Sequence, residues 1–167
     1  MKIEVGNTPK GKKSGAERAS EWYARDVHGC VVAQRAVRTK FQKVDFFACD
    51  CVGKTSDGSH VYLQVTAGND TQVTKRRRKI EEIPWHTSDH VLILQLAYLV
   101  DPSHKGRKLW WFIEHVYSLV SFANNEPSGN DRKWKTRKPP FSIPKHWFSV
   151  WNEKRSSAAP MKKQWIF

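Results

Sequence analysis

The hydrophobic and polar positions in the first part of the chain predict a helix followed by a strand. Ser14 and Glu17 have the spacing of a capping box, and apolar residues recur behind them at helical intervals. We therefore expect a helix over residues 14–28 that ends at Gly29. Residues 31–35 are expected to form a strand, residues 36–43 a basic loop, and the lysine-rich residues 1–13 a flexible arm.

The next apolar segments flank a turn and predict a β-hairpin. Residues 44–51 and 60–66 are strand-like, and Asp57-Gly58 between them is a turn signal. Side chains two residues apart on a strand project from the same face. Gln64 and Thr66 are therefore expected to point together, while Val65 points into the core.

The remaining pattern predicts a second helix and two more strands. Asp70 or Thr71 is expected to cap a helix that carries the basic run 75–79 and stops before Pro84. Residues 91–99 are almost continuously apolar, as in a strand buried on both faces, and residues 109–113 form another strand. The order α-β-β-β-α-β-β predicts an α/β fold with a central mixed β-sheet flanked by helices. We expect a core domain over residues 14–123 and a basic aromatic C-terminal extension over residues 124–167.

The formal charge of the 167-residue chain is +13, and it is concentrated at the two ends. The net charge is +6 over residues 1–44, −1 over residues 45–126 and +8 over residues 127–167. An excess of this size favours a polyanion as partner, and nucleic acid is the usual one. A membrane surface is disfavoured because no basic stretch has an amphipathic helical pattern.

Cysteine usage and hydropathy predict a protein of a reducing, cytoplasmic-type compartment. Cys30, Cys49 and Cys51 cannot all pair, and no second Cys/His pair lies at zinc spacing, so we expect buried small hydrophobes. The sequence contains no 18-residue apolar run and no apolar stretch typical of a signal peptide near its first residue.

Four oxygen-bearing side chains are candidates for a metal site: Glu17, Asp45, Asp50 and Gln64. Mg²⁺ prefers oxygen ligands and keeps several waters, so one or two carboxylates plus a substrate phosphate suffice, and Mn²⁺ is the alternative ion. Each position also has an ordinary interpretation. Glu17 completes a capping box, the two aspartates suit a strand edge, and Gln64 with Thr66 suits the solvent-facing side of an antiparallel strand.

Four short motifs resemble those of the archaeal-type Holliday junction resolvases, which belong to the PD-(D/E)xK nuclease superfamily. The motifs are Lys12-Lys-Ser-Gly-Ala-Glu-Arg18, Val31-Val-Ala-Gln-Arg35, Lys43-Val-Asp45 and Tyr62-Leu-Gln-Val-Thr66. The resemblance covers about residues 10–100 and follows the order of the superfamily's core. It implies a restriction-endonuclease-like fold.

The resemblance also implies residue roles. Glu17 corresponds to the helix-borne acid, Asp45 to the motif aspartate, with Asp50 as its possible substitute, and Gln64 to the Glu/Gln position. Thr66 occupies the place where the family has a lysine that is thought to position the attacking water. Lys79, or another cation of the run 75–79, is the candidate replacement, although the same run could instead contact phosphates.

The implied function is a Mg²⁺-dependent resolvase that acts as a homodimer on four-way DNA junctions, in the cytoplasm of a prokaryotic or phage-infected cell. A catalytically silent branched-DNA-binding protein and a restriction-type or nicking endonuclease are the alternatives. Residues 109–112 could form the dimer interface or core, and the tryptophans of the extension could stack on bases or pack on the domain. The cations predicted to contact DNA are Lys12, Lys13, Arg18, Arg35, Arg38, Lys40, Lys43, Lys75, Arg76, Arg77 and Arg78.

Overall fold

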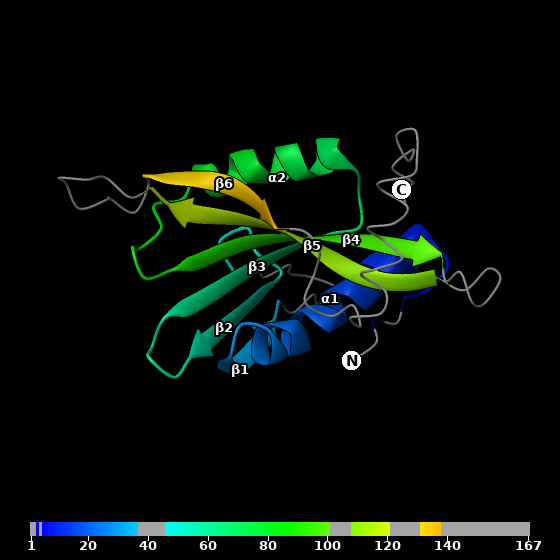
Figure 1. Cartoon of the computed structure of the whole chain (residues 1–167), viewed down its shortest axis with the longest axis horizontal. Helices are drawn as coiled ribbons and strands as arrows, with labels where there is room; N and C mark the ends of the chain where they lie inside the picture. The colour runs from blue at the N-terminus through cyan, green and yellow to red at the C-terminus, as the bar shows by residue number, and fades with distance from the viewer. Residues whose placement is uncertain (1–2, 4, 37–45, 101–107, 121–130, 138–167) are drawn as a thin grey trace, which may run out of the picture.

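The computed structural model describes residues 3, 5–36, 46–100, 108–120 and 131–137, which form one six-stranded mixed sheet with two helices (Figure 1). The strands lie side by side in chain order, and all neighbours are antiparallel except the parallel pair β3–β4. The predicted α/β class with a mixed sheet is confirmed. The elements are α1 (Pro9–Asp26), β1 (Cys30–Arg35), β2 (Cys51–Thr55), β3 (His60–Thr66), α2 (Asp70–Glu81), β4 (His90–Val100), β5 (Lys108–Leu119) and β6 (Arg132–Arg137).

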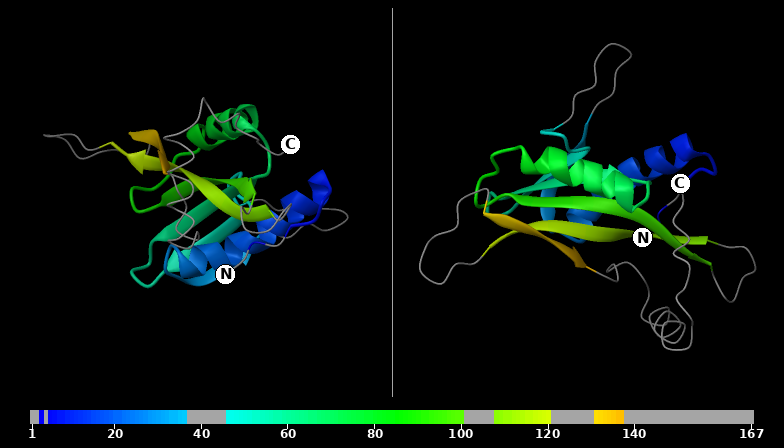
Figure 2. Two further views of the ribbon diagram at one scale, coloured as in Figure 1. Left: turned by 45° about the vertical axis from the view of Figure 1, so that its right-hand side comes forward. Right: turned by 90° about the horizontal axis from the view of Figure 1, so that it is seen from above.

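The two helices cover opposite faces of the sheet (Figures 1 and 2). Helix α1 packs on β1, β2 and β3, whereas α2 packs on β3 and β4. The crossover through α2 is what allows β3 and β4 to run parallel. Neither of these helices is long and apolar enough to span a membrane.

Alternate residues of each strand belong to the two faces. Leu63, Val65 and Leu94 lie in the core cluster beneath α1, whereas Tyr62 and Ile93 pack in the cluster beneath α2. Because β4 is covered on both faces, its continuously apolar sequence matches its place in the middle of the sheet. Trp111 and Phe112 of β5 are also buried, so this part of the expected interface segment is core.

Helix α1 begins five residues earlier than predicted. Thr8 is its N-cap and accepts a hydrogen bond at Oγ1 from Gly11 N (3.1 Å), and Pro9 takes the first helical position. Proline suits that position because its missing N–H would have no partner there. Ser14 and Glu17 therefore lie inside the helix, and the predicted capping box is wrong. Ile3, in the expected arm, is buried in the core.

The first strand of the hairpin spans residues 51–55 and not 44–51 as predicted, because residues 46–49 form a tight turn. Phe46 and Cys49 exchange two backbone hydrogen bonds (3.0 and 2.8 Å), and both residues between them have positive φ. Strand β2 starts only at Cys51. Strand β3 has the predicted bounds, and α2 is capped by Asn69 rather than by Asp70 or Thr71.

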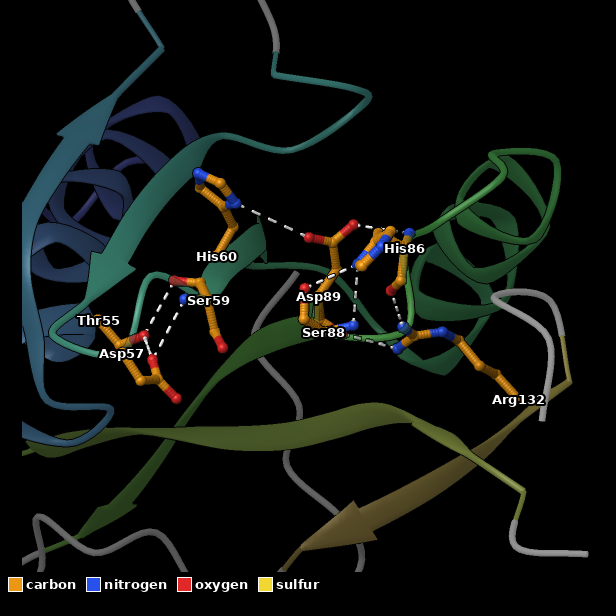
Figure 3. A network of polar contacts seen from close by, with 8 residues as sticks. All are labelled: Thr55, Asp57, Ser59, His60, His86, Ser88, Asp89 and Arg132. Atoms are coloured by element: carbon orange, nitrogen blue, oxygen red, sulfur yellow. Dashed lines mark hydrogen bonds and ion pairs between the residues drawn. The ribbon is translucent and has the colours of Figure 1, made fainter. Parts of the chain in front are cut away.

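Strand β6 comes from the C-terminal extension and was not predicted. Arg132 at its start is 8% exposed, and its guanidinium donates to three carbonyls: His86 O, Asp89 O and Tyr117 O. Figure 3 shows this arginine reaching into the loop between α2 and β4, where His86 and Asp89 also contact each other. One buried side chain therefore ties the extension to the core, and residues 132–137 belong to the sheet.

Candidate functional site

Asp50 and Gln64 meet on the face of the sheet that carries α2. Asp50 directly precedes β2, where its backbone N–H donates to Leu63 O (2.9 Å). Its carboxylate Oδ2 accepts hydrogen bonds from Gln64 Nε2 and from Val65 N (2.9 Å). Asp50 is 5% exposed and Gln64 6% exposed. A carboxylate and an amide are thus held together at a buried position next to β3.

The hairpin register explains why Asp50 faces Gln64. Cys51 pairs with Leu63 and Val52 with Tyr62, so one further step places Asp50 opposite Gln64. Asp45 itself lies outside the described residues. The sequence carried only part of this signal, because a two-residue turn at Asp57-Gly58 would place Cys51 opposite Gln64. The turn that forms has three residues, with Thr55 N donating to Ser59 O (3.0 Å), and it shifts the register by one.

The metal ligands predicted from the sequence are only partly brought together. Glu17 lies on α1, which covers the other face of the sheet, and its carboxylate Oε1 is 3.6 Å from Lys13 Nζ. Within the described ranges, no group of three or more His, Cys, Asp or Glu side chains is arranged to hold a metal ion. Asp50 with Gln64 offers one carboxylate and one amide. With the amide turned so that its oxygen faces the ion, the pair would supply two oxygen ligands, which fits Mg²⁺ completed by water and phosphate.

Thr66 points to the same face as Gln64 but performs a structural task. Its Oγ1 accepts a hydrogen bond from Gly68 N (3.1 Å), and the side chain is 2% exposed. Gln95, which pairs with Thr66 from the neighbouring strand β4, donates from Nε2 to Gly68 O (3.1 Å). The hydroxyl therefore helps to shape the turn that leads from β3 into α2.

We expect Thr66→Ala to lower the free energy of unfolding by about 1 kcal/mol, the usual net value of one intramolecular hydrogen bond. Urea denaturation would compare this variant with Thr66→Ser, which keeps the hydroxyl and should retain the stability of the unchanged protein. Equal stability of Thr66→Ala and the unchanged protein would contradict the structural role of the hydroxyl.

The basic run of α2 divides into an outer and an inner set. Lys75, Arg78 and Lys79 are exposed, whereas Arg76 and Arg77 are half-buried on the two flanks of the line from Val73 to Ile80 that faces the sheet. Lys79, the predicted replacement for the lysine, thus points away from the sheet.

Arg77 occupies the flank of α2 that faces β5 and β6. Its Nη2 is 3.0 Å from His115 Nδ1, and its guanidinium lies 5.1 Å from the centroid of the Trp134 ring. A guanidinium only donates, so His115 Nδ1 accepts, and His115 Nε2 donates to Gln95 Oε1 (2.9 Å). Arg77 is therefore a structural partner of the sheet.

Arg76 lies on the opposite flank, toward β3 and β2, because successive helical residues are rotated by about 100°. Its Nε, like that of Arg77, is buried without a hydrogen-bond partner in the part of the chain that the structure describes. The flanking residues Val73 and Ile80 belong to the same buried cluster as Cys49, which is next to Asp50 in sequence. Arg76 is thus the cation of the run that the helix directs to the side of the Asp50–Gln64 pair, which the residue pattern alone did not single out.

The other predicted DNA contacts occupy several surfaces. Arg18 is exposed and donates to Ser14 Oγ (2.9 Å), while Lys12 and Lys13 are half-buried on α1. Arg35 is held by Glu21 (Nε to Oε2, 2.7 Å). Arg38, Lys40 and Lys43 lie outside the described residues.

Comparison with protein-family models, curated proteins and solved structures finds no match to this chain. The functional argument therefore depends on the residues and their geometry.

Proposed function

We propose that this protein is a Mg²⁺-dependent, structure-selective DNA endonuclease, and specifically a Holliday junction resolvase that acts as a homodimer. The observation that carries the proposal is the contact between Asp50, at the start of β2, and Gln64, in β3. An acidic residue facing a Glu/Gln position across a hairpin is the arrangement that the resemblance to PD-(D/E)xK nucleases leads us to expect. The sequence of elements from α1 to β4, with β3 and β4 parallel, agrees with a restriction-endonuclease-like core.

The chemistry assigned to the site follows from its donor set. Asp50 and Gln64 would hold Mg²⁺, with Asp45 as a further ligand on the proposed pattern, whereas Glu17 lies on the helix that covers the other face of the sheet. A bound ion of this kind activates water and neutralises the charge that develops on the phosphate. Arg76, rather than Lys79, would supply the positive charge that the family's lysine provides. The exposed cations Lys75, Arg78 and Lys79 would contact phosphates and contribute affinity.

A catalytically silent protein that binds branched DNA is the second candidate, and two observations favour it. Thr66 stands in the position of the lysine and uses its hydroxyl on Gly68 N. The Asp50 carboxylate is already satisfied by two hydrogen-bond donors, as a purely structural aspartate would be.

Cleavage of an immobile four-way junction would be compared with cleavage of a linear duplex of the same sequence. The comparison distinguishes a resolvase from a restriction-type enzyme and from a silent DNA-binding protein. The full-length chain would be tested with Mg²⁺, with Mn²⁺ and with EDTA. We expect paired cuts in opposing strands of the junction, dependent on the metal, and no cuts in the duplex. Equal cutting of the duplex would indicate a restriction-type enzyme, and tight junction binding without cutting under any condition would indicate the silent protein.

The two classes of cation on α2 should respond differently to substitution. Arg76→Ala is expected to lower the single-turnover rate by on the order of 100-fold, as for other lost transition-state charges, with little change in affinity. Lys79→Ala is the matched control and should weaken junction binding slightly while reducing the salt slope by about one unit. Gel shifts at several salt concentrations and cleavage time courses would measure both. Equal, small binding losses in both variants with unchanged rates would exclude Arg76 from the chemistry.

A further inference from the structure

Phe47 is an exposed aromatic side chain held in a strained position. It is 63% exposed, and it occupies the tight turn between Phe46 and Cys49. Its φ is +48°, and that of Ala48 is +61°. Bulky side chains rarely adopt this left-handed region, and such strain persists only where surrounding structure maintains it. The turn therefore presents the ring to solvent against the local preference of the backbone.

A cluster of aromatic rings supports Phe47 from beneath. The Phe47 ring makes edge contacts with Tyr62 (centroids 6.0 Å apart) and Trp85 (6.4 Å), which themselves lie 4.9 Å apart. Trp85 is buried and donates from Nε1 to Ile80 O (2.8 Å) at the end of α2. Edge contacts of this kind fix the ring in place while leaving much of its surface open.

The ring lies close to the candidate site and to the basic helix. Phe47 and Asp50 are three positions apart in the sequence, so their Cα atoms are at most about 11 Å apart. Cys49, in the same turn, belongs to the same buried cluster as Val73 and Ile80, the two residues between which α2 carries its run of cations. A group that stacks on the Phe47 ring would therefore lie beside both the Asp50–Gln64 pair and the basic surface of α2, which attracts phosphate.

We infer that Phe47, supported by Tyr62 and Trp85, is a stacking platform for an unstacked nucleobase of branched DNA, within about two nucleotides of the phosphate that is cut. The inference depends on the proposed function, since it names the subsite that the substrate occupies beside Asp50. Every base has a π-face, so an aromatic platform next to cations suits DNA whose bases are exposed at a branch point. A fully stacked duplex offers no such base.

A double-mutant cycle between protein and DNA tests this inference. Binding of the four-way junction would be measured in EDTA, where it is not cut, for the unchanged protein and for Phe47→Ala. Each nucleotide within two positions of the cleaved phosphate would be replaced in turn by an abasic analogue. We expect Phe47→Ala to weaken binding of the intact junction about 5- to 140-fold, corresponding to the loss of one stacked base. On one abasic junction the same substitution should have almost no effect.

Two variants serve as controls for this experiment. Phe47→Trp keeps a π-face and should bind like the unchanged protein. Val32→Ala removes a similarly exposed apolar side chain (59% exposed) from β1, the first strand of the described sheet. This substitution should not affect binding. Thermal unfolding of each variant would confirm that the fold is kept.

The outcomes separate this inference from the proposed function. The stacking site alone would be overturned if the losses of binding free energy from Phe47→Ala and from every abasic substitution were additive, in a protein that still binds and cuts junctions. A change from dimer to monomer in Phe47→Ala, with unchanged affinity per protomer, would overturn it in favour of a protein interface. A protein that neither binds nor cuts junctions would overturn both.

Discussion

Asp50→Asn is expected to abolish junction cleavage, lowering the rate by on the order of 100-fold or more, while junction affinity stays within about threefold. A carboxylate that holds the metal acts in the chemical step, whereas affinity comes mainly from contacts of Lys and Arg with phosphates. Asparagine has almost the same shape, and its Oδ1 can still accept the hydrogen bond from Val65 N. A lost rate would therefore not follow from a lost fold.

Two further aspartates make the Asp50 experiment decisive. Asp57→Asn is the matched control, because Asp57 is exposed in the hairpin turn and accepts from Ser59 N (3.2 Å). It should cleave like the unchanged protein. Asp45→Asn tests the position that the motif resemblance favours. Cleavage by Asp50→Asn at the normal rate, together with loss in Asp45→Asn, would return the metal to Asp45 and leave Asp50 as a structural residue.

Glu114→Ala is expected to produce the largest loss of stability, about 3–5 kcal/mol, because it breaks a buried polar cluster on the α1 face. Glu114 in β5 is 1% exposed and accepts a hydrogen bond at Oε1 from Tyr23 Oη (2.9 Å). His28 Nε2 lies 3.0 Å from the same oxygen, within ion-pair distance but outside hydrogen-bond geometry. Arg137 Nη1 of β6 is 3.9 Å from Oε2. Alanine would leave the Tyr23 hydroxyl, on a fully buried side chain, without its acceptor.

The same cluster predicts how stability depends on pH. Burial by itself raises the pKa of Glu114, but contacts with His28, Tyr23 and Arg137 outweigh it and leave the pKa below its ordinary value. A carboxylate with a lowered pKa in the folded state contributes stability above its unfolded value, about 4.3. That contribution is lost as the pH falls through the folded value. Glu114→Gln should therefore be less stable than the unchanged protein near neutral pH and should lose less stability on acidification.

Urea denaturation at several pH values would measure these effects, with Glu82→Gln as control. Glu82 is an exposed glutamate at the C-terminal end of α2, so its substitution should shift the midpoint only slightly. The m-value should stay constant if Glu114 acts in the folded state alone. An unchanged midpoint in Glu114→Ala would show that the cluster contributes no net stability.

Local signals in the sequence were sufficient for much of the fold. The turn at Asp57-Gly58 and the alternation after it predicted β3 with its correct bounds, and the apolar run 91–99 predicted β4. Both features reflect period and burial of nearby residues, which the sequence carries directly. The order of elements up to β5, the mixed sheet and the common face of Gln64 and Thr66 were predicted for the same reason.

Other features depend on contacts between residues far apart in the chain. Strand β6 was not predicted because its sequence has no clear hydrophobic period. It is held instead by the buried guanidinium of Arg132, which donates to carbonyls more than 40 residues away. Glu114 interrupts an apolar strand, and its partner Tyr23 is 91 residues away. Polar groups of this kind are stable in a core only when a distant partner satisfies them, which no local pattern reveals.

The sequence predicted the residue types of the candidate site, and the structure decided which of those residues meet. The residue types, Asp, Gln and a neighbouring run of cations, were visible in the sequence, together with the face that carries Gln64. The choice of Asp50 came from the register of the hairpin, in which β2 begins at Cys51, seven residues later than predicted, and Asp50 is the residue opposite Gln64. The preference for Arg76 over Lys79 came from the way α2 packs on β3 and β4, which leaves Arg76 half-buried and Lys79 exposed.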